Sequence, residues 1–156
     1  MDSYISIIIP AYNEESRIKY TLESILDIKQ INEIIVVDDG SIDNTAKVVS
    51  ELENEKIKFF KLDKNRGKGY ALNYGIKLAM KNADIIGFLD GDLGSSAKEV
   101  EKLIVPILNG EADVTIAKFP PAKRKGGLGF VKGLAKNSVF EMTGVELDAT
   151  LSGQRI

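Results

Sequence analysis

The stretch IIGFLDGDL, residues Ile85–Leu93, is an apolar run that ends in two aspartates separated by one glycine. Such a run is typical of a strand buried inside a parallel sheet, with its polar groups at its end. We therefore expect Asp90 and Asp92 to lie at the carboxyl edge of a sheet, where open α/β folds bind their ligands.

The glycine between the two aspartates favours a shared site. Gly91 permits a turn that brings both carboxylates near one point. Two carboxylates placed in this way repel each other unless a cation lies between them, and Mg²⁺ or Mn²⁺ suits a site built from oxygen atoms. The alternative is an ordinary loop after a strand, in which the aspartates are solvated or cap the next helix.

Composition excludes several kinds of site. The chain has 156 residues, enough for one domain with a core, and its formal net charge of -2 gives no overall field that favours nucleic acid. It contains no cysteine and no histidine. This rules out disulfides, a thiol nucleophile and a histidine base, so any metal must be held by oxygen.

The N-terminal residues do not resemble a signal peptide. The apolar run Ile5–Ile9 is short, is interrupted by Ser6 and has no basic flank. No stretch approaches the roughly 20 apolar residues of a membrane span. We expect a cytoplasmic protein with at most peripheral contact to a membrane.

Short β-branched runs alternate with segments of helical period along the chain. Strands are expected at Ile5–Ile9, Glu33–Val37, Lys58–Leu62, Ile85–Leu89 and Asp113–Ala117, and helices at Glu14–Leu26, Asn44–Leu52, Gly69–Asn82 and Ser96–Leu108. Pro10 is expected to stop the first strand, Asn13 to cap the first helix, and Pro106 to kink or shorten the last.

This alternation predicts the fold class: α/β, a doubly wound, mostly parallel sheet with helices on both faces. In the third helix, Leu72, Ile76 and either Ala79 or Met80 are expected to face inward. Successive strand ends then deliver their loops to one edge, which gathers 12–14, 38–41 and 90–92 around one cleft.

Two regions are expected along the chain: an α/β core over residues 1–117, and a segment over 118–156 that is truncated at Ile156. The second region begins with a basic, glycine-rich run that includes Lys123–Gly127. We interpret this run as a mobile lid; a patch facing an anionic membrane and a solvated loop are the alternatives.

Four motifs carry a family resemblance. They are IIPAYNEE at 8–15, VVDDGS at 36–41 with Asp43 and Thr45, NRGKG at 65–69, and LDGD at 89–92. Together and in this order they resemble the family 2 glycosyltransferases with the GT-A fold, in the style of the polyprenyl-phosphate or dolichyl-phosphate sugar synthases. The resemblance implies metal-dependent transfer of a sugar from a UDP- or GDP-sugar to an acceptor, with inversion. It also implies that residues 1–117 are the nucleotide-sugar binding core and that 118–156 are part of an acceptor-side segment.

The resemblance also implies roles for individual residues. Tyr12 would lie against the base, Asp39 would accept a hydrogen bond from it, and Lys68 would face the pyrophosphate. The full set of implied donor-site residues is Pro10, Ala11, Tyr12, Glu14, Asp38, Asp39, Gly67, Lys68, Asp90 and Gly91.

For catalysis, the resemblance implies that Asp92 binds Mn²⁺ or Mg²⁺, which neutralises charge on the leaving diphosphate. Asp90 would bind the sugar or ribose hydroxyls, or the metal through a water molecule. Asp148 would act as the base or orient the acceptor, and Arg155 would face a phosphate. Without histidine, a base acting on an alcohol acceptor would be a carboxylate.

The sequence also fits other functions. The chain could be a non-catalytic nucleotide-binding module or an inactive fragment. A sugar-phosphate nucleotidyltransferase is less favoured, because no glycine-rich loop with Arg and Lys follows the first strand. The acceptor could be a polyprenyl phosphate lipid or another sugar, and the chain could form a homodimer.

Overall fold

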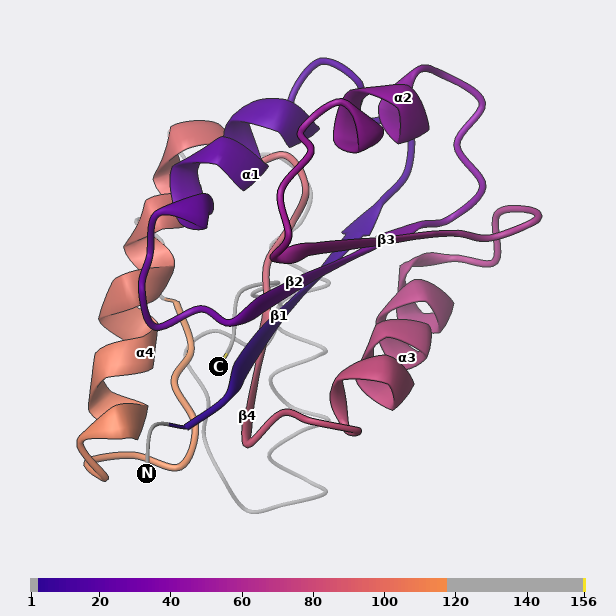
Figure 1. Ribbon diagram of the computed structural model, residues 1–156. Coiled ribbons are helices and arrows are strands. Elements are labelled where there is room, and N and C mark those ends of the chain that lie inside the picture. The colour runs from indigo at the N-terminus through magenta and orange to yellow at the C-terminus, as the bar shows by residue number, and fades with distance from the viewer. Residues whose placement is uncertain (1–2, 118–155) are drawn as a thin grey trace, which may run out of the picture.

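The computed structural model describes residues 3–117 and 156. The elements are β1 (Ile5–Ala11), α1 (Ile18–Leu26), β2 (Glu33–Asp38), α2 (Thr45–Ser50), β3 (Ile57–Lys61), α3 (Lys68–Ala79), β4 (Ile85–Phe88), the 3₁₀ helix η1 (Gly94–Val100) and α4 (Glu101–Leu108) (Figure 1). The expected alternation of strands and helices is confirmed.

Four strands of the described chain form one parallel sheet in the order β3-β2-β1-β4. The chain moves outward from β1 to β3 and then returns to place β4 on the other side of β1. Because all four strands run the same way, their carboxyl ends share one edge. The reversal of strand order at β1 marks the place where such sheets bind ligands.

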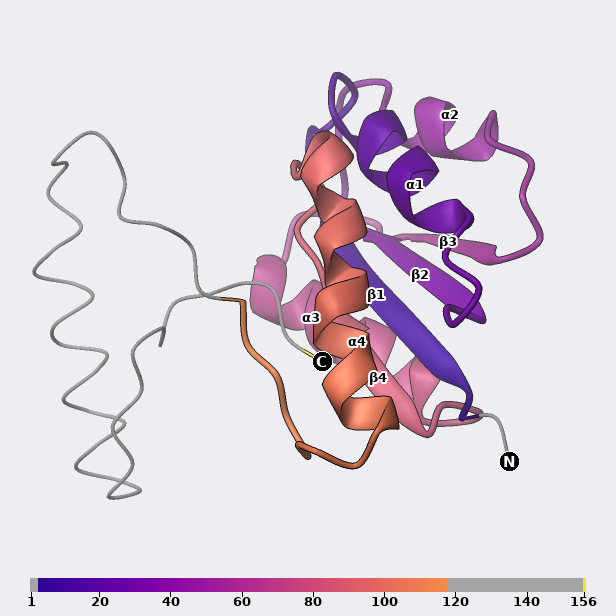
Figure 2. The ribbon, with the colours of Figure 1, turned by 90° about the vertical axis from the view of Figure 1, so that its left-hand side faces the viewer.

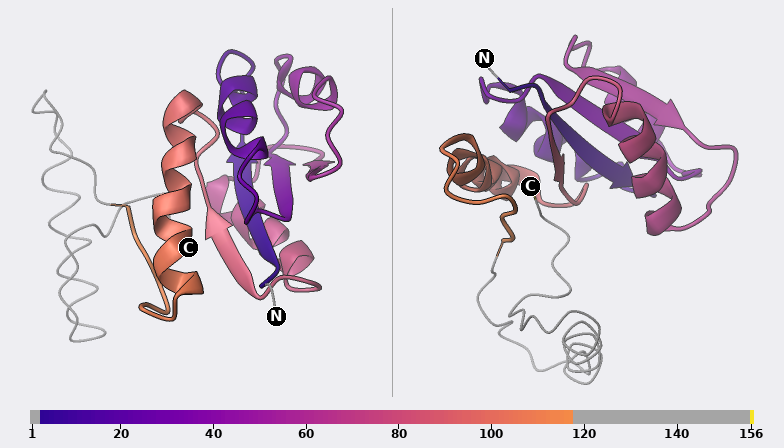
Figure 3. Two further views of the ribbon diagram at one scale, coloured as in Figure 1. Left: turned by 60° about the vertical axis from the view of Figure 1, so that its left-hand side comes forward. Right: turned by 90° about the horizontal axis from the view of Figure 1, so that it is seen from below.

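Helices cover both faces of the sheet, as predicted. On one face, α1, η1 and α4 pack through Leu22, Val100 and Ile104 against alternate residues of β1 such as Ile7 and Ile9. On the other face, α3 packs against Ile8, the β1 residue between Ile7 and Ile9, and against β2. Figure 2 shows α1 and α4 in front of the sheet, and the right-hand view of Figure 3 shows the sheet between α4 and α3.

Pro10 does not stop β1, which continues to Ala11. Ile8 O accepts a hydrogen bond from Leu89 N, so the backbone polar groups of Ile8 point toward the β4 side. Residues two apart on a strand point to the same side, so the nitrogen of Pro10 also faces the β4 side. Pairing with β4 ends at Ile8 and Phe88. The missing N–H of proline therefore leaves no ladder bond unmade.

The first helix begins at Ile18, not at Glu14, and Asn13 does not cap it. Asn13 has a φ of 54°, and its side-chain oxygen accepts a hydrogen bond from Ile42 N at 3.0 Å. The backbone N–H of Glu14 donates to Thr45 Oγ1 at 2.8 Å. Contacts with the loop before α2 and with the first residue of α2 thus hold this segment outside the helix.

Two predictions near the end of the described chain need correction, and one of the two alternatives for Pro106 is excluded. Asp113–Ala117 forms no strand among the described residues; instead Thr115 exchanges two backbone hydrogen bonds with Ile156, at 2.9 and 3.1 Å. The expected helix at Ser96–Leu108 is divided into η1 and α4, and Pro106 does not end α4 early.

In α3, Ala79 is buried, whereas Met80 follows the helix and is 70% exposed. Of the two alternatives for an inward residue, Ala79 is therefore the right one. None of the helices in the described part of the chain is long and apolar enough to cross a bilayer.

Candidate functional site

A pocket of about 350 Å³ opens at the carboxyl edge of the sheet. Segments that follow β1, β2, β3 and β4 meet there, as the strand order requires. Its lining residues are Pro10, Ala11, Tyr12, Glu14, Asp39, Asn65, Gly67, Lys68, Asp90, Gly91 and Asp92. The structure therefore brings together nearly all of the donor-site residues predicted within the described chain.

The two aspartates after β4 each lie beside a cation. Asp90 forms an ion pair with Lys68 at the start of α3. Arg17 directly precedes α1, and its Nη1 lies 3.4 Å from Asp92 Oδ2. The aspartate side chains are 28% and 44% exposed, so both carboxylates remain accessible from the pocket.

The donor atoms of the pocket fit a hard divalent cation. Within residues 3–117 and 156, no group of three or more acidic side chains is close enough to hold a metal by itself. Mg²⁺ in phosphate-transfer sites is commonly held by one or two carboxylates, with substrate phosphates and water completing the coordination. Asp90 and Asp92 provide such a partial set. The positively charged side chains of Arg17 and Lys68 beside them show that the site favours positive charge.

Glu14 lies at the pocket next to the acidic pair. Its Oε2 is 2.8 Å from Arg17 Nη2, so one guanidinium contacts both Glu14 and Asp92. Burial raises the pKa of the Glu14 carboxyl above its usual value; Arg17 partly offsets the rise, and the charge of Asp92 adds to it. Glu14 is thus electrostatically coupled to the predicted metal ligand.

Asp39 is nearly buried and joins two loops of the pocket. Its Oδ1 accepts a hydrogen bond from Arg66 N at 2.8 Å, and its Oδ2 accepts one from Gly67 N at 2.7 Å. The next residue, Gly40, has a φ of 72°, and a Cβ there would lie 2.5 Å from the carbonyl carbon of Lys64. The close approach of these loops needs glycine, and it places Asp39 in the pocket wall.

Asp38, also predicted as a donor-site residue, is not brought to the pocket. Its side chain is buried, and Oδ1 accepts a hydrogen bond from Ser41 N at 2.8 Å. Its Oδ2 lies 3.8 Å from Lys61 Nζ on the neighbouring strand. In the structure, Asp38 shapes the turn after β2.

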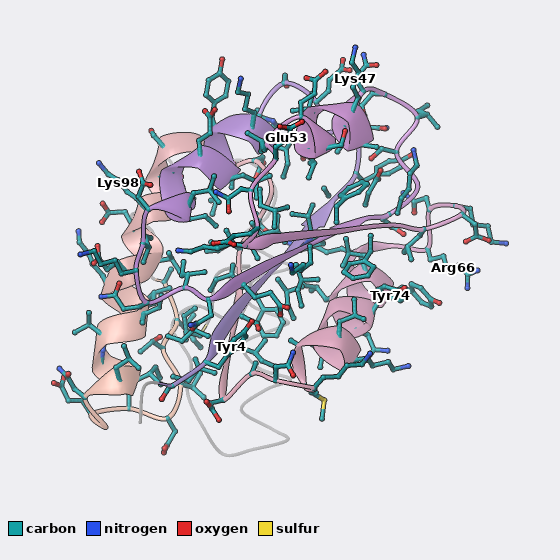
Figure 4. The ribbon with its side chains drawn as sticks, in the orientation of Figure 1. Tyr4, Lys47, Glu53, Arg66, Tyr74 and Lys98 are labelled. Atoms are coloured by element: carbon teal, nitrogen blue, oxygen red, sulfur yellow. The ribbon has the colours of Figure 1, made fainter. Side chains whose placement is uncertain are left out.

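Tyr12 lines the pocket and is 43% exposed, which leaves its ring available to a ligand. Gly67 and Lys68 line the pocket at the start of α3. Arg66, from the same motif, does not line it; the guanidinium lies 4.9 Å from the centre of the Tyr70 ring, and Figure 4 shows Arg66 at the outer edge of the molecule.

Sequence reasoning assigned no role to Asn65 or Arg17, which the structure places at the site. Asn65 belongs to the NRGKG motif, which was the available signal. Arg17 had no such signal, because its partner Asp92 is 75 positions away in the chain. Asp148 and Arg155 lie outside the described residues.

Comparison with known proteins agrees with this geometry. The family model for "Glycosyl transferase family 2" matches residues 6–144. A UDP-N-acetylglucosamine--dolichyl-phosphate N-acetylglucosaminyltransferase of Methanococcus voltae is 34% identical over 153 residues, covering 82% of this chain and 61% of that protein. The minor teichoic acid biosynthesis protein GgaA of Bacillus subtilis (strain 168) is 33% identical, covering 78% of this chain and 29% of that protein.

Among solved structures, this chain is similar to glucosyl-3-phosphoglycerate synthase from Mycobacterium tuberculosis, in complex with Mn²⁺, UDP-glucose and phosphoglyceric acid. The TM-score is 0.74 at 27% identity, covering 98% of this chain and 55% of that one. The chain thus spans less than two thirds of the length of each of these relatives.

Proposed function

This chain belongs to glycosyl transferase family 2 and has the GT-A fold, and from that premise we propose that it transfers a sugar from a nucleoside diphosphate sugar to an acceptor. The observation that supports this most is the pocket, in which segments from all four sequence motifs meet. A single cleft lined by backbone, an exposed tyrosine, a lysine and carboxylates suits a ligand that combines a flat base, a diphosphate and hydroxyl groups.

For the donor, we propose a UDP-sugar. Tyr12 offers an aromatic face to the base, while Asp39 and Glu14 offer carboxylate oxygens to base and ribose. Lys68 brings a positive charge to the diphosphate. The names of two relatives support uridine: one uses UDP-N-acetylglucosamine, and the other was solved with UDP-glucose.

We propose that Asp92 and Asp90 hold Mn²⁺ or Mg²⁺. When bound, the ion supplies Lewis-acid stabilisation of the charge that develops on the leaving nucleoside diphosphate. The residues on the protein side bind and orient: the acidic pair faces the pocket, and Lys68 adds a fixed charge beside it. The Mn²⁺ in the similar synthase supports this assignment.

For the acceptor side, we propose transfer with inversion to a phosphate-bearing acceptor, a polyprenyl phosphate lipid reached at the membrane surface, with a sugar as the alternative. The relatives named for dolichyl phosphate and phosphoglycerate support an anionic acceptor. A phosphate acceptor needs no base, whereas an alcohol acceptor would need one, for which Asp148 stays the predicted residue. In this proposal residues 1–117 bind the donor and 118–156 contribute to the acceptor side.

Calorimetric titration of UDP and GDP, with and without Mn²⁺, tests the proposal. Wild-type protein and the control Asp27→Ala, at the far end of α1, should bind UDP more tightly when Mn²⁺ is present. In Asp92→Ala, the affinity for UDP in the presence of Mn²⁺ should be weaker than in the wild type by about tenfold or more. If neither nucleotide binds under any condition, the proposal is wrong for this chain.

Turnover separates the remaining functions. A glycosyltransferase should at least hydrolyse a UDP-sugar slowly to UDP and free sugar. UDP binding without any hydrolysis or transfer would identify a non-catalytic binding module. Release of pyrophosphate from a nucleoside triphosphate and a sugar phosphate would identify a nucleotidyltransferase instead.

A further inference from the structure

The loop after β4 is held by a hydroxyl group of α1. This loop, Asp90–Gly94, is called the acidic loop below. The Thr21 side chain is buried, and its Oγ1 donates a hydrogen bond to Gly91 O at 2.8 Å. The same atom accepts one from Gly94 N at 2.9 Å. One hydroxyl therefore both donates to and accepts from a loop about 70 positions away in the chain, while Arg17 O at 3.4 Å is a more distant second acceptor for its proton.

These two bonds lie on either side of Asp92. They join α1 to Gly91, directly before Asp92, and to Gly94, two residues after it. The backbone between these two glycines is therefore bound to Thr21 at both ends. Ser24, one turn further along α1, shares its single hydroxyl proton between Thr21 O at 2.8 Å and Gly94 O at 3.1 Å. Two hydroxyls of one helix thus define the path of the acidic loop.

The acidic loop depends on such contacts because the sheet ends before it. Strand β4 stops at Phe88, so the ladder with β1 does not continue to the two aspartates. Gly91 is packed tightly: a Cβ there would lie 3.2 Å from Ile18 Cδ1 and 3.4 Å from Pro10 O. The backbone has a fixed position between β1 and α1, and Thr21 satisfies its polar groups there.

We propose that Thr21 is a positioning residue for the divalent cation: its hydroxyl holds the acidic loop so that the Asp92 carboxylate faces the pocket. This inference rests on the proposed function, because it concerns the predicted metal ligands. Groups that orient metal ligands act on metal affinity through the ligand geometry, without touching the ion. Thr21 acts through the backbone of Gly91 and Gly94.

The test compares Thr21→Val, which keeps the shape but removes the hydroxyl, with Thr21→Ser, which keeps the hydroxyl. Thr21→Ala is a second hydroxyl-free variant that favours the helix, in case the valine variant does not fold. Ser6→Ala is the matched control. It removes another buried hydroxyl, which donates to Glu33 Oε1 at 2.8 Å near the start of β1.

Three quantities are measured: the Kd for Mn²⁺ with UDP present, the Kd for UDP without metal, and the exchange rate of the Gly94 amide proton by NMR. Thr21→Val and Thr21→Ala should weaken Mn²⁺ binding about 10- to 100-fold. They should leave metal-free UDP binding unchanged and speed exchange at Gly94. Thr21→Ser and Ser6→Ala should match the wild type in all three.

Several results would overturn the inference. Unchanged Mn²⁺ affinity in both hydroxyl-free variants would show that the hydroxyl does not position the ligands. An equal loss of Mn²⁺ and metal-free UDP affinity would show a general structural role. Failure of the proposed function is seen separately, because the wild-type protein would then bind neither UDP nor Mn²⁺.

Discussion

At the scale of single residues, the pocket is an arrangement of opposite charges. Arg17 lies between Glu14 and Asp92, and Lys68 pairs with Asp90. Each predicted metal ligand therefore already has a positive neighbour. A divalent cation entering the pocket must compete with these neighbours for the carboxylates.

Arg17→Gln tests this competition. Removing the guanidinium should tighten binding of Mn²⁺ alone, in the absence of nucleotide, by up to about fivefold, because exposed ion pairs contribute about 1 kcal/mol or less. Lys19→Gln is the control: Lys19 is as exposed as Arg17, at 54%, but pairs with Glu23 on the same helix. Mn²⁺ titration measures the effect, and unchanged or weaker binding in Arg17→Gln would contradict it.

Glu14 predicts a pH dependence of stability. Because the pKa of Glu14 is raised in the folded state, the folded protein holds this proton more tightly than the unfolded chain does. The contribution of Glu14 to stability therefore falls as the pH rises from its usual value of 4.5 through the raised value. Glu14→Gln removes this titration.

The difference in Tm, Glu14→Gln minus wild type, should be larger at pH 7 than at pH 4. The comparison uses thermal unfolding without ligand at both pH values. Glu23→Gln, in the exposed i,i+4 pair of α1, serves as the control for general effects of pH. A difference in Tm that is equal at both pH values would count against the assignment.

At the scale of elements, the helices are positioned by contacts with distant loops. Asp43 Oδ1 accepts hydrogen bonds from Thr45 N at 2.9 Å and Thr45 Oγ1 at 2.5 Å, and its Oδ2 accepts one from Glu15 N at 3.2 Å. Asp43, two residues before Thr45, thus binds the first residue of α2 and also holds the segment before α1. This contact helps to place Glu14 at the pocket.

Asp43→Ala should lower the free energy of unfolding at pH 7 by about 0.5 to 2 kcal/mol, because the first backbone N–H of α2 loses its carboxylate acceptor. Burial alone would raise the pKa of Asp43, but hydrogen bonds from Thr45 and Glu15 lower it below the usual 3.8. The stabilisation is therefore present above 3.8 and lost as the pH falls through the lowered value. Urea unfolding at pH 7 and at lower pH measures this effect. The loss of unfolding free energy in Asp43→Ala relative to the wild type should be smaller at the lower pH. In the control Asp27→Ala, the difference from the wild type should not change in this way.

Helix α3 packs closely on β1 through Gly75. A Cβ at this position would lie 2.5 Å from Ile8 Cγ2, in the buried interface between helix and sheet. Gly75→Ala should therefore destabilise the protein by about 1 to 3 kcal/mol, although alanine favours a helix.

Gly69→Ala in the same helix is the matched control, because nothing lies within 4 Å of an added Cβ there. This variant should be stabilised by up to about 1 kcal/mol. Denaturant unfolding of both variants gives the comparison. Equal effects of the two substitutions would mean that α3 does not approach β1 this closely.

At the scale of the whole molecule, the pocket exists only because the sheet is complete. Its walls follow four parallel strands in the order β3-β2-β1-β4, so unfolding any part separates the ligand contacts. Binding should therefore stabilise the whole domain. UDP with Mn²⁺ at about 100 times its Kd should add about 2.7 kcal/mol.

A thermal shift assay measures this coupling. The Tm of wild-type protein and of Asp27→Ala should rise with UDP and Mn²⁺ together. Asp92→Ala should show a smaller rise. No rise in the wild type at saturating ligand would argue against a donor site in this pocket.

The sequence predicted the strands well where burial decides them. The expected Ile85–Leu89 strand differs from β4 by one residue, because a β-branched run in the interior has few alternatives. The errors occurred where a distant partner decides the conformation. Asn13 lost its capping role to contacts with the loop before α2, and Thr115 pairs with Ile156 in place of the expected strand.

The sequence by itself determined the α/β class, the edge of the sheet that carries the site, and most of the residues that line it. These follow from local patterns, since apolar runs give strands and the polar residues after them meet at one edge. Only the tertiary structure decided which of the adjacent Asp38 and Asp39 reaches the pocket, and that Arg17 and Thr21 of the α1 region contact the acidic loop. Such choices depend on side-chain direction and on contacts between residues some 70 positions apart, which no local pattern contains.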